Sequence, residues 1–245
     1  MSASAEYLQS CRETMEKLST SQLPAIDAAA ELIAERVAAG GIVFTFGTGH
    51  SHELAEEVAY RAGGIVPVSP ILEPSLTGST EVGKSEFLER LEGFAPHILD
   101  YHHVGPQDVL IIISNSGRNG VPVEMAIEAH RRGIPVIALT SLAYSHQVSS
   151  RAASGKKLYE LADVVIDNCA PHGDAVVHLP GVPQPVGPMS TVGGAAVMHA
   201  VMVGVAERLV GKMDPVPVFV SGNLDGVWEK NTEMMGPYRA RVRFW

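Results

Sequence analysis

The sequence predicts an α/β domain in which helices cover both faces of a parallel β-sheet. Five short apolar runs, rich in β-branched residues, alternate with stretches of helical periodicity. Strands that read as continuous apolar runs are typical of parallel sheets buried on both faces. With 245 residues the chain is long enough for one large domain and too short for two with independent cores. We therefore expect a three-layer sandwich around a five-stranded parallel sheet.

Each element is expected from its local pattern. The strands are expected at residues 42–46, 65–68, 109–113, 135–139 and 164–166. The helices are expected at residues 5–19, 24–39, 51–62, 122–132 and 190–206. Pro24 near a first turn and the glycine pairs after residues 39 and 62 mark helix ends, as does Gly133.

Composition and charge exclude several classes of protein. The formal net charge is −9, from 18 Lys and Arg against 27 Asp and Glu, so nucleic acid is not the expected partner. Cys11 and Cys169 are too few for a disulfide framework or a cysteine-based zinc site. The first residues are polar and amphipathic, unlike a secretion signal. The uncharged segment 190–206 is shorter than the roughly 20 residues of a membrane span. We expect a cytoplasmic protein without a membrane partner.

Glycines and hydroxyl side chains follow three of the expected strands. These loops are residues 47–52 (GTGHSH), 114–120 (SNSGRNG) and 140–141 (TS). Right-handed crossovers place the carboxyl ends of parallel strands at one edge, where open α/β sheets bind ligands. Backbone N–H groups at helix starts and neutral hydroxyl donors suit an oxyanion. An ordinary serine-capped turn would explain any one of these loops, but three at one edge favour an anion site.

Two nucleotide-binding patterns fit less well. In the first loop His52 replaces the third glycine of the dinucleotide motif G-x-G-x-x-G, which argues against NAD. Residues 78–85 (GSTEVGKS) match the P-loop pattern G-x-x-x-x-G-K-[ST], with Lys84 as its lysine. The nearest expected strand, however, ends at residue 68, and two prolines intervene. A P-loop enzyme is thus a distant alternative.

Three ionisable residues are candidates for proton transfer. Glu57 lies on the expected helix 51–62, whose apolar face carries Leu54, Ala55, Val58, Ala59 and Ala62. Glu73 follows the second strand, where a solvated loop charge is the alternative explanation. His199 interrupts the uncharged segment 190–206, where it is either a hydrogen-bonded core residue or a functional group.

The motifs GTGHS (47–51) and SNSG (114–117) resemble the two signatures of the sugar isomerase (SIS) domain family, in its phosphoheptose-isomerase-like bacterial subgroup. The resemblance covers about residues 25–210 of a single domain 1–245, leaving residues 1–24 as a helical extension and 211–245 as a tail. It implies a sheet of flavodoxin-like strand order, a sugar-phosphate ligand, and assembly as a homodimer or homotetramer.

The resemblance, together with the loop pattern, gives a set of expected substrate-binding residues. Ser51, Ser114 and Ser116 would hold the phosphate. The full set is Gly47, Thr48, Gly49, His50, Ser51, Ser114, Asn115, Ser116, Gly117, Asn119, Thr140 and Ser141. Asn119 stands where the family usually has Thr.

The same resemblance lets the family's catalytic and zinc-binding positions be compared with the residues of this chain. Phosphoheptose isomerases carry Glu where this chain has Arg61, and a zinc-binding His where it has Glu57. His199 resembles their catalytic His on the final helix. No cofactor is expected, although a divalent metal such as zinc stays open, because H-x-H at residues 50–52 is only a weak metal signal.

Two main hypotheses follow. In the first, the protein is an aldose–ketose isomerase acting through an enediolate, with Glu57 or Glu73 as base and His199 or His50 as acid. In the second, it is a non-catalytic phosphosugar sensor, which Arg61 in place of a catalytic carboxylate favours.

Overall fold

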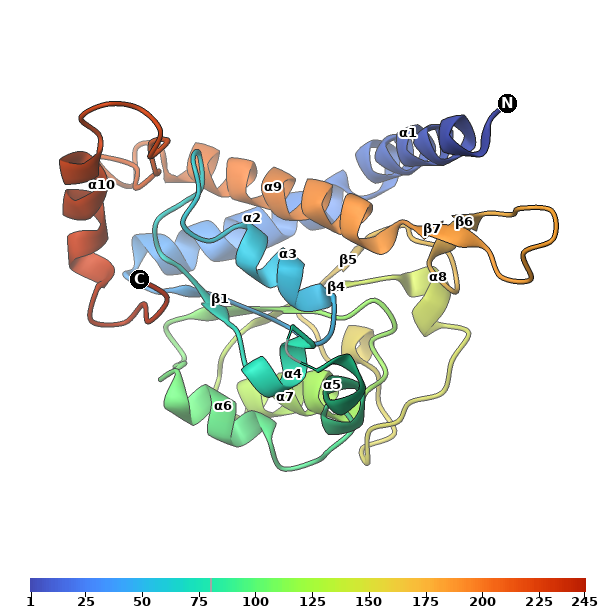
Figure 1. Cartoon of the computed structure of the whole chain (residues 1–245). Coiled ribbons are helices and arrows are strands. Elements are labelled where there is room, and N and C mark those ends of the chain that lie inside the picture. The colour runs from blue at the N-terminus through green and yellow to red at the C-terminus, as the bar shows by residue number, and fades with distance from the viewer. Residues whose placement is uncertain (80) are drawn as a thin grey trace.

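The central sheet of the computed structural model has the predicted strand order (Figure 1). Within residues 1–79 and 81–245, which the structure describes, five strands pair in parallel in the order β2-β1-β3-β4-β5. They are β1 (Val43–Gly47), β2 (Val68–Ile71), β3 (Val109–Ile113), β4 (Val136–Thr140) and β5 (Val164–Asp167). This is the flavodoxin-like order, which confirms the expected fold, and the strand order reverses between β1 and β3.

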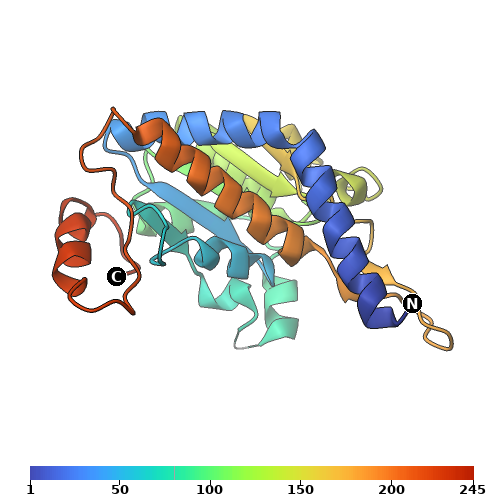
Figure 2. The same cartoon turned by 90° about the horizontal axis from the view of Figure 1, so that it is seen from above.

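Helices cover both faces of the sheet, as Figures 1 and 2 show. One face carries α1 (Ala3–Ser21), α2 (Leu23–Ala38), α3 (Ser51–Glu57) and α9 (Ser190–Leu209). The other carries α4 (Pro74–Thr77), α5 (Val82–Leu88), α6 (Ala95–Tyr101) and α7 (Gly120–Arg131). The short helix α8 (Leu142–Ser145) and the 3₁₀ turn Leu158–Glu160 connect β4 to β5.

Each face of the sheet has its own hydrophobic core. In β3, Val109, Ile111 and Ile113 pack against the layer that contains α2 and α9. Leu110 and Ile112 point to the opposite core, beside α6 and α7. Strands buried on both faces need apolar residues at every position, which explains the run VLIII. Helix α9 is apolar enough and long enough to cross a membrane, but it packs along α2 and supplies eight buried residues.

The second strand is shifted from its expected position. It was expected at residues 65–68 and forms at Val68–Ile71, so that Thr45 pairs with Pro70. Pro70 is tolerated because β2 is an edge strand with a partner on one side only. Ile65 instead forms an antiparallel bridge with Val218 from the C-terminal segment. Tertiary pairing therefore overrides the local apolar pattern here.

Helix α3 is shorter than expected. It ends at Glu57 rather than continuing to residue 62, and Tyr60 adopts a positive φ of 47°. The backbone of Gly63 then donates to the carbonyl of Phe219, 2.9 Å away. Leu54, Ala55, Val58 and Ala59 are buried as predicted, whereas Ala62 is exposed.

A hairpin that the sequence did not reveal precedes α9. Its strands are β6 (Ala175–Val177) and β7 (Val186–Pro188), paired antiparallel. The hydroxyl of Tyr7 on α1 donates to the carbonyl of Pro188 at 2.8 Å. The N-terminal helix thus supports the hairpin.

The C-terminal segment packs into the core on the α6 and α7 side of the sheet. It contains α10 (Trp228–Met235) and the 3₁₀ turn Gly236–Tyr238. Phe219 and Val242 are buried among the residues of that core. Arg241 donates to both carboxylate oxygens of the fully buried Asp108. Residues 211–245 were expected as a tail, and they close one side of the domain.

Candidate functional site

The loops after β1 and β3 line one cavity at the carboxyl edge of the sheet. Its volume is about 450 Å³, and Ser51, Ser114 and Ser116 all contribute to its wall. The cavity therefore lies where the strand order reverses, the usual ligand position in such sheets. The lining residues are Thr48, Gly49, His50, Ser51, Leu54, Glu86, Glu89, Ile113, Ser114, Asn115, Ser116, Asn119, Tyr144, Asn168, Gly173, Asp174, Ser190 and Thr191.

The glycines of the first loop allow α3 to start directly above β1. A Cβ atom on Gly47 would come within 2.5 Å of the backbone of Ser51, so a side chain would push the helix away. Gly49 has a positive φ of 53°, a conformation that glycine adopts without strain. Ser51 is consequently the first residue of α3, at the cavity wall. Gly47 itself is buried beneath the helix.

The second loop is held from below by β4 and α8. Thr140 Oγ1 donates to the carbonyl of Asn115 at 3.2 Å, and Ser145 Oγ donates to that of Ser116 at 2.7 Å. The Ser114 hydroxyl accepts the Gly117 N–H at 3.2 Å, closing the turn. These bonds fix the orientation of the loop around the cavity.

Thr140 and Ser141 lie behind this loop instead of in the cavity. Both are fully buried, and neither belongs to the lining residues that the structure describes. Ser141 Oγ donates to Ala170 at 2.6 Å and accepts the Tyr144 N–H at 3.0 Å. They support the site, whereas the sequence led us to expect contact with the substrate.

Glu89, which sequence analysis did not single out, joins the two loops. Its carboxylate accepts from Thr48 Oγ1 at 2.7 Å and from Asn119 Nδ2 at 2.6 Å. Arg151 donates to the side-chain oxygen of Asn119 at 3.2 Å. The side chains of Thr48 and Asn119, expected to meet a ligand, are therefore already engaged. Because Glu89 is far from both motifs in the sequence, no local signal pointed to it.

The opposite wall comes from β5, the hairpin and α9. Asn168 Nδ2 donates to Asn115 Oδ1 at 3.0 Å, which holds the second loop from this side. Asp174 accepts from the N–H groups of Met189 and Ser190 and from the Ser190 hydroxyl. The carboxylate of Asp174 thus caps α9 at its first turn.

Glu57 and His199 meet each other outside this cavity. The distance from His199 Nε2 to Glu57 Oε1 is 3.1 Å, and Arg61 contacts the same carboxylate oxygen. The side chains of Glu57 and His199 are about 40% exposed (38% and 42%). Neither residue belongs to the described lining of the cavity.

The Glu57 position does not form a metal site within one chain. In residues 1–79 and 81–245 no cluster of three or more His, Cys, Asp or Glu side chains is placed to hold an ion. Glu57 has one imidazole neighbour, and the cation of Arg61 competes for its carboxylate. These residues do not fit a zinc ion, which needs three or four protein ligands.

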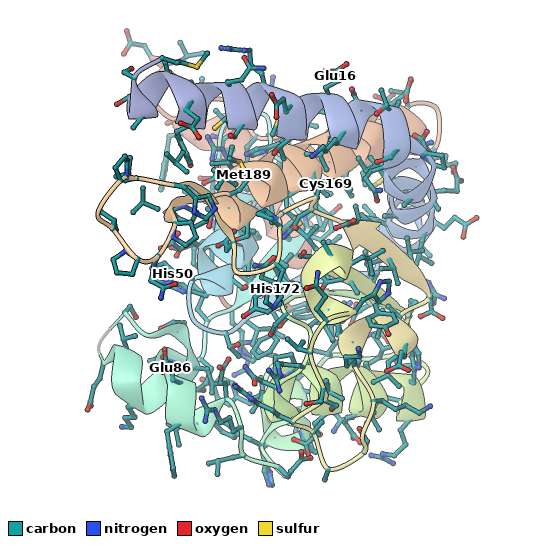
Figure 3. The ribbon with its side chains drawn as sticks, turned by 90° about the vertical axis from the view of Figure 1, so that its right-hand side faces the viewer. Glu16, His50, Glu86, Cys169, His172 and Met189 are labelled. Carbon is teal, nitrogen blue, oxygen red and sulfur yellow. The ribbon has the colours of Figure 1, made fainter. Side chains whose placement is uncertain are left out.

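Glu73 and His50 have different surroundings. The carboxylate of Glu73 caps α4, accepting from the N–H and hydroxyl of Ser75. Its position is that of a helix cap, away from the described cavity lining. His50 is exposed and lines the cavity, and Figure 3 shows it on the loop that faces Glu86 of α5.

A second, smaller hollow of about 330 Å³ adjoins the cavity and shares Gly49, His50 and Glu86 with it. Four residues of the segment that matches the P-loop pattern line this hollow: Gly78, Ser79, Val82 and Ser85. That segment follows α4 rather than a strand, and α5 has only seven residues. Thr80, within the pattern, lies outside the described residues. The strand–loop–helix setting of a P-loop is not found in the described part of this segment.

The fold and this edge cavity define a class: doubly wound α/β proteins with a glycine- and serine-rich ligand site at the strand-order reversal. The family model described as "SIS domain" matches residues 6–141. The chain belongs to the SIS domain family.

Relatives with a curated sequence match nearly the whole chain. A UPF0309 protein of Geobacillus kaustophilus is 39% identical over 237 residues, which is 97% of this chain and 94% of that protein. A UPF0309 protein of Halalkalibacterium halodurans is 43% identical, over 97% of this chain and 98% of the other.

Solved structures share the fold at low sequence identity. The phosphoheptose isomerase of Neisseria gonorrhoeae is 19% identical with a TM-score of 0.57, covering 82% of this chain and 96% of that one. The NanR protein of Vibrio vulnificus, complexed with ManNAc-6P, is 17% identical with a TM-score of 0.54, covering 94% and 67%.

Proposed function

We propose that this protein binds sugar phosphates in the edge cavity, with the phosphate held by Ser51, Ser114 and Ser116. The observation that carries the proposal is that Ser51 lines the same cavity as Ser114 and Ser116, which follow it by 63 and 65 residues in the chain. The NanR structure, titled as a complex with ManNAc-6P, and the phosphoheptose isomerases of the same fold support this class of ligand.

The remaining cavity suits the sugar. Asn115, Asn168 and Thr191 add polar side chains to the wall, and Leu54 and Tyr144 add apolar surface. Hydroxyl-rich ligands need such a mixture, because each buried hydroxyl group costs free energy unless it finds a hydrogen-bond partner. The expected partner is therefore a small sugar phosphate that lies in the cavity with its anion towards the serines.

We further propose aldose–ketose isomerisation as the reaction. It needs a base at the carbon next to the carbonyl and an acid at the carbonyl oxygen. His50, on the cavity wall, is the candidate acid within one chain. Glu57 and His199 form a hydrogen-bonded pair that suits proton transfer, about 9 Å along α3 from Ser51.

A phosphosugar sensor without turnover is the second candidate. It is favoured by the contact of Glu57 with Arg61 and by the position of Glu57 outside the cavity lining. The guanidinium of Arg61 occupies the carboxylate oxygen that a catalytic base would turn towards a substrate.

We also propose a homodimer that pairs through the outer face of α9. On that face a stripe at spacings of three and four residues carries no Asp, Glu, Lys or Arg. The residues of this α9 stripe are Val192, Ala196, His199, Val203 and Ala206, followed by Val210 directly after the helix. Val203 and Val210 are about 70% exposed (69% and 72%). Such spacing is that of paired helices, and an antiparallel second copy would present the same stripe.

One pair of experiments tests binding and reaction. A thermal-shift series with hexose, heptose and amino-sugar phosphates should raise the melting temperature for at least one compound. NMR in D₂O should then show deuterium entering C1 or C2 of that compound. Stabilisation without exchange would select the sensor, and the absence of any stabilisation across the series would reject the binding proposal.

A further inference from the structure

The positions in the cavity that would attract a second anion are already filled by the protein's own carboxylates. Of the described lining residues three are acidic, Glu86, Glu89 and Asp174, and none is Lys or Arg. The described lining therefore carries three carboxylates and no Lys or Arg, so every anionic group that a ligand carries beyond its phosphate adds repulsion. The charge of the lining therefore selects among sugar phosphates by the number of anionic groups that they carry.

Glu89 fills the first of these positions. Thr48 Oγ1 and Asn119 Nδ2 are donors at the cavity wall, and both point to the carboxylate of Glu89, at 2.7 and 2.6 Å. Two hydrogen bonds to one carboxylate are strong, since an ionised acceptor roughly doubles their strength. A ligand anion would have to displace Glu89 to use either donor.

The backbone holds Glu89 at this position. Its carbonyl accepts the N–H of Val121, in the first turn of α7, at 2.9 Å. A Cβ atom on Gly120 would lie 2.9 Å from the carbonyl oxygen of Arg90, so only glycine lets the segment after α5 approach the start of α7 this closely. The carboxylate is therefore built into the wall and is not a free surface charge.

Asp174 fills the second position. The start of the 20-residue helix α9 would otherwise attract an anion, because its N–H groups and dipole are positive. Instead, Asp174 accepts from the N–H groups of Met189 and Ser190 at 3.0 and 2.6 Å, and from the Ser190 hydroxyl at 2.8 Å. The serines of the two loops are left as the place for a single anion.

We propose that Glu89, together with Asp174 and Glu86, restricts the site to sugar monophosphates whose remaining groups are neutral or cationic. Ligands with a second anionic group, such as an aldonic acid phosphate or a bisphosphate, bind more weakly. The physical reason is that a like charge held next to fixed carboxylates in a half-enclosed cavity is strongly unfavourable. This inference rests on the proposed binding of sugar phosphates and names the chemical class that is selected.

Isothermal titration calorimetry with three probes tests the inference: glucose 6-phosphate, gluconate 6-phosphate and inorganic phosphate. The two sugar compounds share a six-carbon chain; gluconate 6-phosphate is open and carries a carboxylate at C1, whereas glucose 6-phosphate closes to a neutral ring. Because the same two compounds are compared in every variant, the change in their affinity ratio reports the charge of the variant residue. The wild type should bind glucose 6-phosphate at least about tenfold more tightly than gluconate 6-phosphate at low salt. In Glu89→Gln the ratio should fall to within about threefold, because the fixed charge is gone.

A matched variant controls for overall charge. Glu56→Gln makes the same change on the exposed side of α3, outside the described lining of both hollows, and should leave the ratio unchanged. Should Glu89→Gln fail to fold, Glu86→Gln removes a charge from an exposed wall residue and should lower the ratio by itself.

The outcomes separate this inference from the proposed function. Equal affinity of the wild type for both sugar compounds, or an unchanged ratio in a folded Glu89→Gln, would overturn the inference and leave phosphate binding intact. If none of the three probes binds, the same pair of variants is titrated with a compound that stabilises the protein in the thermal-shift series, and failure of that whole series overturns sugar-phosphate binding itself.

Discussion

His199 Nε2 lies 3.1 Å from Glu57 Oε1, which joins the middle of α9 to the last residue of α3. Ser51 is the first residue of the same short helix, at the wall of the cavity. The proposed anion site and the hydrogen-bonded Glu57–His199 pair thus lie at opposite ends of α3. This separation is why binding and turnover need separate tests.

The first prediction concerns the serines. Ser51→Ala should weaken the affinity for a bound sugar phosphate by about 10- to 100-fold, since a hydrogen bond to a charged group contributes about 1.5–3 kcal/mol. Adding Ser116→Ala should weaken it further by a similar factor. Calorimetry measures the change. Ser19→Ala, exposed on α1, is the control and should bind as the wild type does.

The second prediction separates support of the loop from contact with the ligand. Ser141→Ala should lower the free energy of unfolding by about 1–3 kcal/mol, because it leaves the buried carbonyl of Ala170 without its donor. The affinity for a sugar phosphate should change less than it does in Ser51→Ala. Urea unfolding and calorimetry measure the two effects. A larger loss of affinity than of stability would mean that Ser141 contacts the ligand after all.

The third prediction concerns acid stability. Hydrogen bonds from Arg131 and Arg132 lower the pKa of Glu128 from 4.5 to about 2, against the opposing effect of burial. Because the folded pKa is the lower one, this group stabilises the fold above pH 4.5, and that stability is lost as the pH falls towards 2.

In Glu128→Gln, the free energy of unfolding should therefore depend less on pH between about 4.5 and 2 than it does in the wild type. Urea titrations at several pH values in this window measure the slope. Glu56→Gln, at an exposed position, should keep the wild-type slope. Identical slopes for the wild type and Glu128→Gln would disprove the assignment.

The fourth prediction tests the α9 stripe. Val203→Glu places a charge at a side chain that is 69% exposed in one chain, and should convert the dimer to a monomer. Light scattering after size-exclusion chromatography measures the mass. Leu8→Glu changes an exposed apolar residue of α1, and the dimer should persist. A monomeric wild type would refute pairing through this face.

Local pattern was enough for the parts of the fold that are buried on both sides. The run VLIII predicted β3 at residues 109–113, because every position of a doubly covered strand must be apolar. The edge strand β2 was misplaced by three residues, since its register depends on β1 and on the C-terminal segment that pairs with Ile65.

Close approach of distant segments produced the features that no local pattern revealed. Glu89 reaches the cavity because Gly120 allows the segment after α5 to pass close to the start of α7. Asp108 and Arg241 are 133 residues apart and meet in the fold.

By itself, the sequence determined the α/β class, the strand order through its family motifs, and the loops that carry Ser51, Ser114 and Ser116. Periodicity, glycines and hydroxyl side chains are local properties of the chain, so they can be identified without coordinates. Only the tertiary structure decided that Thr140 and Ser141 lie behind the site, that Glu57 pairs with His199 outside it, and that Glu89 lies within it. Those outcomes depend on how helices pack on the sheet, which is settled by contacts between residues far apart in the chain.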